Sequence, residues 1–146
     1  MILNHSGMPH DAGPAGVADW RDGMRTLTAC DNLAVKISGL GMMNDHWTID
    51  TIRPFVLDAL EIFGTDRACL ASNFLLDGLF SSFVDLWQAF VDITAGASPD
   101  DQDGLFRTTA ETLYWRGQGY RSRRDPPVCR AAKADGRLHQ LFGQLL

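Results

Sequence analysis

The chain shows two hydrophobic periodicities that alternate along its length. Short runs of apolar and β-branched residues at 2–5, 33–37 and 68–72 predict three strands, of which the alternating 33–37 segment is the clearest. Between and after these runs, apolar residues recur at spacings of three and four, which predicts amphipathic helices. The residues on the helical stripes are Val17, Trp20, Met24 and Leu27; Ile52, Phe55, Val56, Ala59, Leu60 and Phe63; and Phe83, Leu86, Trp87, Phe90, Val91 and Thr94.

Local signals at the helix ends support this division. Gly64 is placed to end the second helix as its C′ residue. Ser98 and Pro99 make an N-cap and a first-turn proline, so a last helix is expected from there to about Tyr114. Strands that alternate with helices are typical of an α/β protein with a parallel sheet and right-handed crossovers. We therefore expect the apolar stripes to pack on such a sheet.

Length and charge divide the chain into a body and a tail. Its 146 residues are too few for a complete (β/α)8 barrel, which takes about 250 residues. Residues 1–116 hold 7 Lys and Arg against 16 Asp and Glu, a balance of −9, and residues 117–146 hold 6 against 2, a balance of +4. The second segment also begins with glycine and proline breakers. We predict a folded body at 1–116 and a basic tail at 117–146 that is disordered or weakly helical.

Composition excludes several kinds of partner. A net charge of −5 and a pI near 5.2 give no support to nucleic-acid binding. No apolar run reaches the roughly 18–20 residues of a membrane span, so no membrane is expected as a partner. The N-terminus lacks the basic and apolar regions of a signal peptide, and we expect a cytoplasmic protein.

Polar residues stand where each predicted strand ends. They are His5, Lys36 and Asn73, separated by 31 and 37 residues, which is one strand–helix unit each time. The carboxyl ends of parallel strands share one edge of the sheet, and neighbouring strands lie about 4.8 Å apart. The three side chains are therefore expected to converge on one small molecule. The alternative for each is structural: a satisfied histidine, a lysine that reaches solvent and an asparagine that caps a turn.

The predicted loops after these strands add further candidates. The loops at 6–15, 38–47 and 74–81 are longer than typical βα loops of about 2–6 residues, and long loops on one rim often build pockets. Asp77 is a candidate acid or base there, with an N-cap or a solvated loop acid as the alternative. His46 is a candidate for substrate binding, with an exposed loop residue as the alternative. The residues show no His-x-His pair and establish no metal site.

Three motifs occur in order along residues 1–116: NHSG at 4–7, VKISGL at 35–40, and FGTDR at 63–67 leading into ASNF at 71–74. Together they resemble amidohydrolase family 2, the predicted metal-dependent TIM-barrel hydrolases that include lactonases. The resemblance implies that the body is the C-terminal portion of a partial (β/α)8 barrel, formed by its last three βα units. It also implies a divalent metal such as zinc in an intact enzyme.

The resemblance also implies roles for the candidate residues. His5 corresponds to a metal ligand or active-site residue, and Lys36 lies in a strand that lines the barrel. Asn73 stands where an aspartate is common, and Asp77, four residues on, is a substitute acid or base. The pair Leu75-Leu76 replaces the more usual Pro-Val of this loop, and no strand with His-x-His precedes these motifs.

Three hypotheses about function follow. The first is a hydrolase of lactones or related cyclic esters, of which this chain is an incomplete fragment that is inactive when alone. The second is a non-catalytic α/β fragment that assembles with a partner chain, such as a complementary half of the barrel, or with itself. The third is a small α/β module that binds a small molecule. Three strands of a barrel leave two unpaired edges, so we expect association or marginal stability.

Overall fold

The structure is a computed structural model, and it describes residues 1–115. Three short strands form one parallel sheet in the order β1 (Ile2–Leu3), β2 (Ala34–Ile37) and β3 (Ala68–Leu70). Leu3 lies opposite Val35, which in turn lies opposite Ala68. The predicted parallel arrangement is confirmed. Strands β1 and β3 end two residues earlier than predicted, and β2 ends where predicted. His5 and Asn73 therefore lie beyond the hydrogen-bonded part of the sheet.

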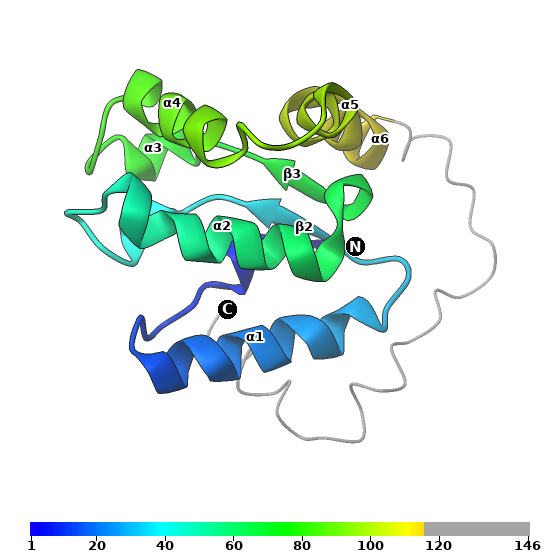
Figure 1. The fold of residues 1–146 in the computed structure, drawn as a ribbon, viewed down its shortest axis with the longest axis horizontal. Helices are drawn as coiled ribbons and strands as arrows, with labels where there is room; N and C mark the ends of the chain where they lie inside the picture. The colour runs from blue at the N-terminus through cyan, green and yellow to red at the C-terminus, as the bar shows by residue number, and fades with distance from the viewer. Residues whose placement is uncertain (116–146) are drawn as a thin grey trace.

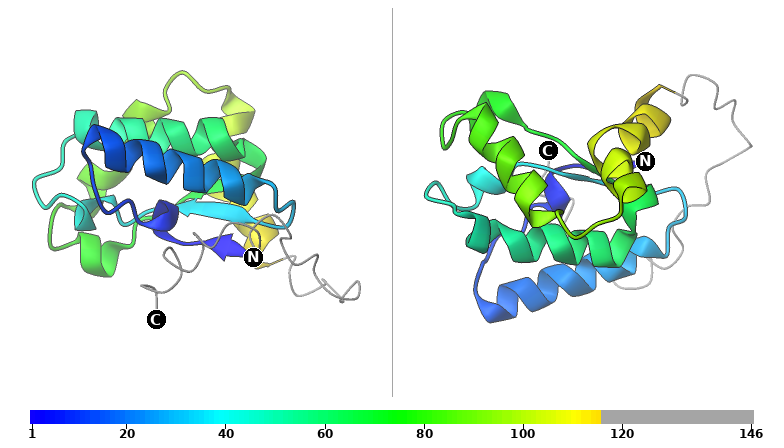
Figure 2. Two further views of the ribbon diagram at one scale, coloured as in Figure 1. Left: turned by 90° about the horizontal axis from the view of Figure 1, so that it is seen from below. Right: turned by 45° about the horizontal axis from the view of Figure 1, so that its top comes forward.

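Helices connect the strands and pack on one side of the sheet. Helix α1 (Pro14–Thr28) joins β1 to β2, and α2 (Ile49–Phe63) joins β2 to β3. Both helices lie on the same side of the strands (Figures 1 and 2). After β3 come a short helix α3 (Phe74–Asp77), helix α4 (Phe83–Ile93) and a helical segment made of α5 (Pro99–Asp103), a π-helical turn and α6 (Thr109–Tyr114).

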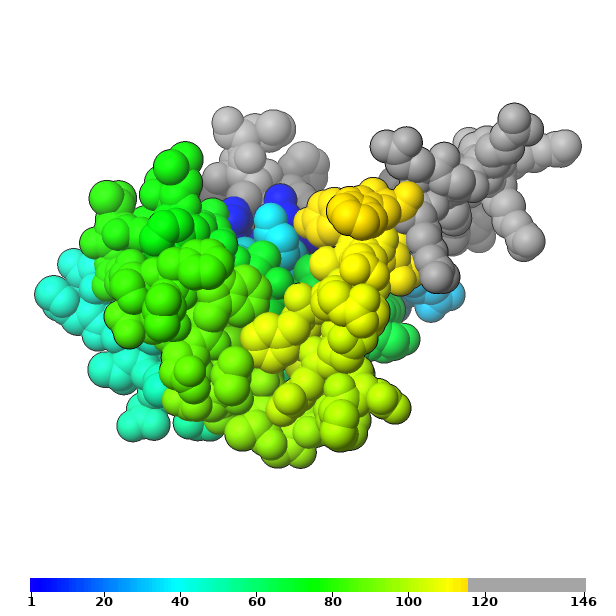
Figure 3. All heavy atoms as spheres, turned by 90° about the horizontal axis from the view of Figure 1, so that it is seen from above, coloured from blue at the N-terminus to red at the C-terminus, as the bar shows by residue number. Residues whose placement is uncertain are grey.

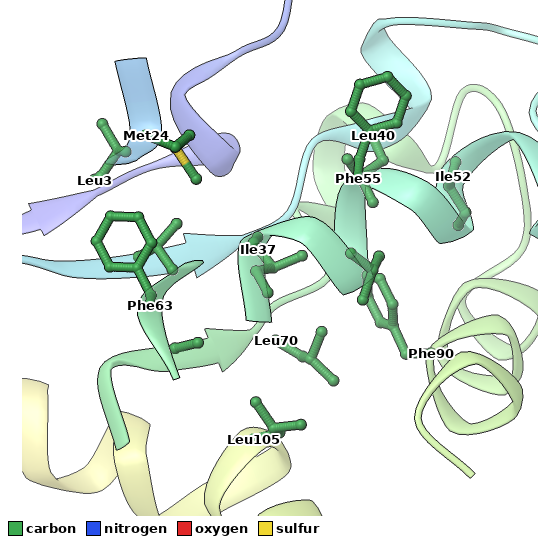
Figure 4. Close-up of a cluster of buried hydrophobic side chains, with 14 of the residues drawn as sticks. Leu3, Met24, Ile37, Leu40, Ile52, Phe55, Phe63, Leu70, Phe90 and Leu105 are labelled. Atoms are coloured by element: carbon green, nitrogen blue, oxygen red, sulfur yellow. The ribbon is translucent and has the colours of Figure 1, made fainter. Parts of the chain in front are cut away.

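The hydrophobic core lies between the sheet and these helices (Figure 4). Leu33, Val35 and Ile37 belong to it, whereas Lys36 does not, as the alternation along this strand predicts. The predicted stripes on α1 and α2 also face this core. Two predicted core residues of α4 do not: Phe83 and Val91 are each 46% exposed. Their stripe is wider than the face of α4 that neighbouring helices cover within residues 1–115.

The helix ends follow the expected chemistry. The Asp101 backbone N–H donates to Ser98 Oγ, which confirms the predicted start of the last helical segment. Gly64 ends α2 with a φ of +76°. Helix α2 begins with a capping box, in which Thr48 and Thr51 satisfy each other's backbone N–H groups. Helix α3 lies in a segment predicted as a loop, because four residues carry too little periodicity to indicate a helix.

The fold described above covers the body of the chain. The predicted tail at 117–146 lies outside the described residues. Within residues 1–115, no helix is both long and apolar enough to cross a membrane. Seen from above, atoms of the N-terminal segment and of the segment around β2 lie between the α3–α4 region and α6 (Figure 3).

Candidate active site

His5 follows β1 in an unusual backbone conformation. Four consecutive residues have positive φ: His5 at 53°, Ser6 at 52°, Gly7 at 70° and Met8 at 51°. Left-handed backbone costs roughly 1–2 kcal/mol for a residue with a side chain, so three of these four residues are strained. Such strain persists where the surrounding structure determines the conformation, and it clusters at functional sites. The turn is closed by two backbone hydrogen bonds, from Gly7 to Asn4 and from Met8 to His5.

The turn places the His5 imidazole against the end of β2. A hydrogen bond of 3.0 Å joins His5 Nδ1 and Ser38 Oγ. A Cβ on Gly39 would lie 2.8 Å from His5 Nδ1, so glycine is required there for the ring to approach. Burial, together with the positive charge of Lys36, lowers the pKa of His5 below its ordinary value. The imidazole is therefore neutral at pH 7 and can accept or donate a hydrogen bond.

Lys36 lies on the opposite side of the sheet from the hydrophobic core. It is half-buried, and it pairs in register with Cys69 of β3. Its ammonium group is near enough to act electrostatically on His5 and on Cys69, where burial raises the thiol pKa and Lys36 opposes that rise. No carboxylate pairs with Lys36 in the part of the chain that the structure describes. The ammonium is thus available to an anionic group.

Asn73 reaches the same region from the end of β3. Its backbone is left-handed, with a φ of 47°, and its Nδ2 donates to Met42 Sδ at 3.7 Å. The Met42 methyl group also lies beside Gly39, where a Cβ would approach it to 2.8 Å. Met42 therefore stands between Asn73 and the Gly39 backbone that His5 contacts. The structure brings His5, Lys36 and Asn73 to one edge of the sheet, which is the arrangement that their positions at strand ends predict.

Asp77 lies below this edge and is only 1% exposed. Within residues 1–115 neither carboxylate oxygen has a hydrogen-bond partner of good geometry, and the Asn73 side chain and the Gly39 backbone are the donors that act on its pKa. Burial raises the pKa of Asp77, and these two donors only partly oppose the rise. The alternative of a solvated loop acid is excluded by this burial. The carboxyl faces Asn73 and not the solvent.

Other predicted residues do not join this group. His46 has a side chain that is 93% exposed, and its Nε2 lies 4.0 Å from the neighbouring Asp45. His10 is also exposed. The sequence reasoning did not assign roles to Gly39 or Met42. The Ser-Gly pair directly after a strand is a signal that could have found Gly39, whereas nothing in the pattern around Met42 distinguishes it.

The described residues do not supply a complete metal site. Within residues 1–115, no group of three or more His, Cys, Asp or Glu side chains is arranged to hold a metal ion. His5 is a single imidazole whose Nδ1 is engaged with Ser38, and Asn73 presents an amide where a carboxylate would bind a cation more strongly. A metal would need further ligands from outside these residues.

The class of protein follows from comparison with known families. The family model described as Amidohydrolase matches residues 1–116, and the chain belongs to this family. The uncharacterized protein y4mH of Sinorhizobium fredii (strain NBRC 101917 / NGR234) is 50% identical over 114 residues, which are 78% of this chain and 38% of that protein.

Two solved structures agree with this assignment. Both are crystal structures of an amidohydrolase from Burkholderia multivorans, one with bound HEPES and one with bound zinc. They match with TM-scores of 0.73 and 0.72 and identities of 24% and 25%, and each match covers 77% of this chain and 43% of that protein. The chain therefore spans less than half the length of the relatives that it matches, and its α/β fold corresponds to part of theirs.

Proposed function

We propose that residues 1–115 are the C-terminal βα units of an amidohydrolase barrel whose complete form hydrolyses a lactone or a related cyclic ester. The observation that carries this proposal is the gathering of His5, Lys36 and Asn73 at the carboxyl ends of three adjacent parallel strands. Active sites of (β/α)8 barrels lie at this end. Family membership supports a hydrolase, and the chain's share of its relatives' length supports an incomplete barrel.

Each residue has a defined part in the proposed reaction. Water attacks the ring carbonyl carbon, the bond from that carbon to the ring oxygen breaks, and one proton of the water passes to the ring oxygen, so that the product is an open-chain hydroxy acid. His5 donates a hydrogen bond to the carbonyl oxygen from Nε2, since Nδ1 is engaged with Ser38. Lys36 stabilises the charge that develops on this oxygen, or binds a carboxylate of the substrate. Asn73 orients the water, and no step is assigned to a metal because the described residues do not complete a site.

Asp77 acts through Asn73 in this proposal. Its burial keeps it from water and substrate, whereas the Asn73 side chain is a donor that acts on its carboxyl group. Asp77 is thus a positioning residue for the carboxamide. His46 stays a candidate for substrate binding on the exposed loop after β2.

The same structure supports a partner for this chain. Within the described residues, β1 and β3 each pair on one side only, which leaves two strand edges open to further pairing. Large apolar side chains are also exposed next to the site, with Leu75 at 93%, Leu79 at 77% and Val84 at 72%. A complementary barrel half would cover strand edges, and self-association is the alternative. A non-catalytic assembly of this kind is the second candidate function.

A hybrid enzyme tests the hydrolase proposal. Residues 1–116 replace the matched 114-residue segment of y4mH, and the product is assayed on a panel of lactones with and without Zn²⁺ or Mn²⁺. We expect hydrolysis that His5→Ala and Lys36→Ala reduce by a factor of 10² or more, on the scale of lost transition-state stabilisation. His10→Ala is the matched control, because it removes an exposed imidazole from the following loop. His46→Ala shows whether that loop contributes.

The possible outcomes separate the candidate functions. A folded hybrid without hydrolysis, or hydrolysis that survives His5→Ala, would contradict the catalytic proposal. Size-exclusion chromatography of the 146-residue chain, alone and mixed with the remaining part of y4mH, tests assembly. Complex formation without hydrolysis would favour the non-catalytic assembly. A stable monomer that does not bind the remaining part of y4mH would favour a small binding module.

A further inference from the structure

Trp20 is joined to the strained turn that carries His5. It lies on α1, and its indole N–H donates to the Ser6 backbone oxygen at 2.7 Å, in a buried environment. Ser6 is the second of the four residues with positive φ and is fully buried. Within residues 1–115 the hydroxyl of Ser6 has no hydrogen-bond partner, whereas its carbonyl group accepts from Trp20.

The indole ring itself is held firmly by the core. Trp20 is 6% exposed and packs edge-on against Phe55 of α2, with ring centroids 5.4 Å apart. Its N–H direction is therefore set by the packing of two helices. The Ser6 carbonyl lies in the peptide bond between Ser6 and Gly7, and Ser6 is the residue that follows His5. A donor fixed in the core thus acts on the backbone one residue away from the imidazole.

The other indole groups make a contrast. Trp47 and Trp87 also have buried Nε1 atoms, but neither has a hydrogen-bond partner within residues 1–115. Burial alone therefore does not give every tryptophan of this fold an acceptor. The hydrogen bond of Trp20 is made to a carbonyl group of the left-handed turn.

We propose that Trp20 is a positioning residue for His5: its indole N–H holds the left-handed turn, and the turn holds the imidazole against Ser38 and Gly39. Without this bond the strained residues would relax toward right-handed or extended backbone, since non-glycine residues disfavour positive φ. The ring would then leave the end of β2. This inference deepens the proposed function, because it concerns the same imidazole, but its test requires no hydrolysis.

The test compares two tryptophan variants of the 146-residue chain by NMR of the histidine rings. Trp20→Phe keeps an aromatic ring and removes the N–H that binds Ser6. Trp87→Phe is the matched control, since it removes an indole whose N–H has no partner and which packs edge-on against Phe90. We expect Trp20→Phe to shift the His5 ring ¹⁵N signals toward those of the exposed histidines. The Nδ1 signal in particular should lose the shift that its hydrogen bond with Ser38 Oγ causes. Trp87→Phe leaves the His5 signals in place.

A rescue variant separates positioning from general packing. Ser6→Gly in the Trp20→Phe background provides a residue that adopts positive φ readily, and it removes a hydroxyl that has no partner. We expect this double variant to recover the wild-type His5 signals in part. Equal changes in Trp20→Phe and Trp87→Phe, or unchanged His5 signals in Trp20→Phe, would overturn the proposal.

Wild-type protein provides a test that does not depend on a variant that folds. The indole proton of Trp20 should exchange with solvent at least tenfold more slowly than that of Trp87. The Trp20 indole N–H is hydrogen-bonded to Ser6, whereas that of Trp87 has no partner within residues 1–115. Exchange of the Trp20 proton as fast as that of Trp87 would refute the bond on which the proposal rests. A lack of lactone hydrolysis in the hybrid enzyme would leave both results unaffected.

Discussion

The burial of Asp77 leads to a prediction that runs against the usual effect of substitutions in a protein interior. The residue is 1% exposed, and in the described part of the chain neither carboxylate oxygen has a hydrogen-bond partner of good geometry. An ionised group in such a place destabilises the native state. We therefore expect Asp77→Asn, which keeps the shape and removes the charge, to stabilise the folded chain at neutral pH.

The size of the effect follows from the titration of this carboxyl group. Below its ordinary pKa of 3.8, both the folded and the unfolded chain carry the proton, and ionisation adds no penalty. As pH rises above 3.8, the unfolded chain releases its proton first, so the native state loses stability until the pH passes the raised native pKa. At about 1.4 kcal/mol per pH unit, this loss cannot exceed about 4 kcal/mol at pH 7. Burying the neutral amide of asparagine subtracts about 1–2 kcal/mol, so the net gain is at most about 2–3 kcal/mol.

Urea unfolding followed by tryptophan fluorescence measures this difference. Asp77→Asn should be more stable than the wild type at pH 7, and the advantage should disappear below about pH 4. Asp31→Asn is the matched control, because it makes the same change at an exposed position and should shift stability by less than about 0.5 kcal/mol. A variant that is less stable than the wild type at pH 7, or a gain that is the same at both pH values, would show that the buried carboxylate makes favourable interactions.

Three further substitutions test the structure. Gly39→Ala should lower the unfolding free energy by about 1–3 kcal/mol and shift the His5 ring signals, because φ is +70° and the added Cβ would lie 2.8 Å from His5 Nδ1; unchanged NMR signals would contradict the close approach. Thr48→Ala should destabilise the chain by about 1 kcal/mol in urea unfolding through the loss of the capping box, and a neutral effect would mean that the cap is not formed. Phe90→Ala removes a fully buried ring and should lower the unfolding free energy by about 3–5 kcal/mol, as followed by far-UV circular dichroism. A loss much smaller than this would show that α4 does not pack in the core.

The placement of the candidate site residues could be predicted in large part because it depends on strand ends. The alternation along 33–37 separates Lys36 from the core residues on either side, and this holds in the structure. Once the sheet is parallel, His5, Lys36 and Asn73 come to the same edge, since His5 and Asn73 follow β1 and β3 and Lys36 is the penultimate residue of β2. The family that the three motifs resemble is also the one whose model matches residues 1–116.

The sequence by itself determined the type and order of the main elements and the edge at which their polar residues gather, because these depend on hydrophobic periodicity and on local caps. Only the tertiary structure decided how the site is held and which residues belong to it. The bond from Trp20 to Ser6 joins residues 14 apart, and that between His5 and Ser38 joins residues 33 apart. Contacts at such separations leave no periodic signal in the chain. The burial of Asp77 is decided in the same way, by the packing of α3 against the turn at Leu40–Met42 that follows β2.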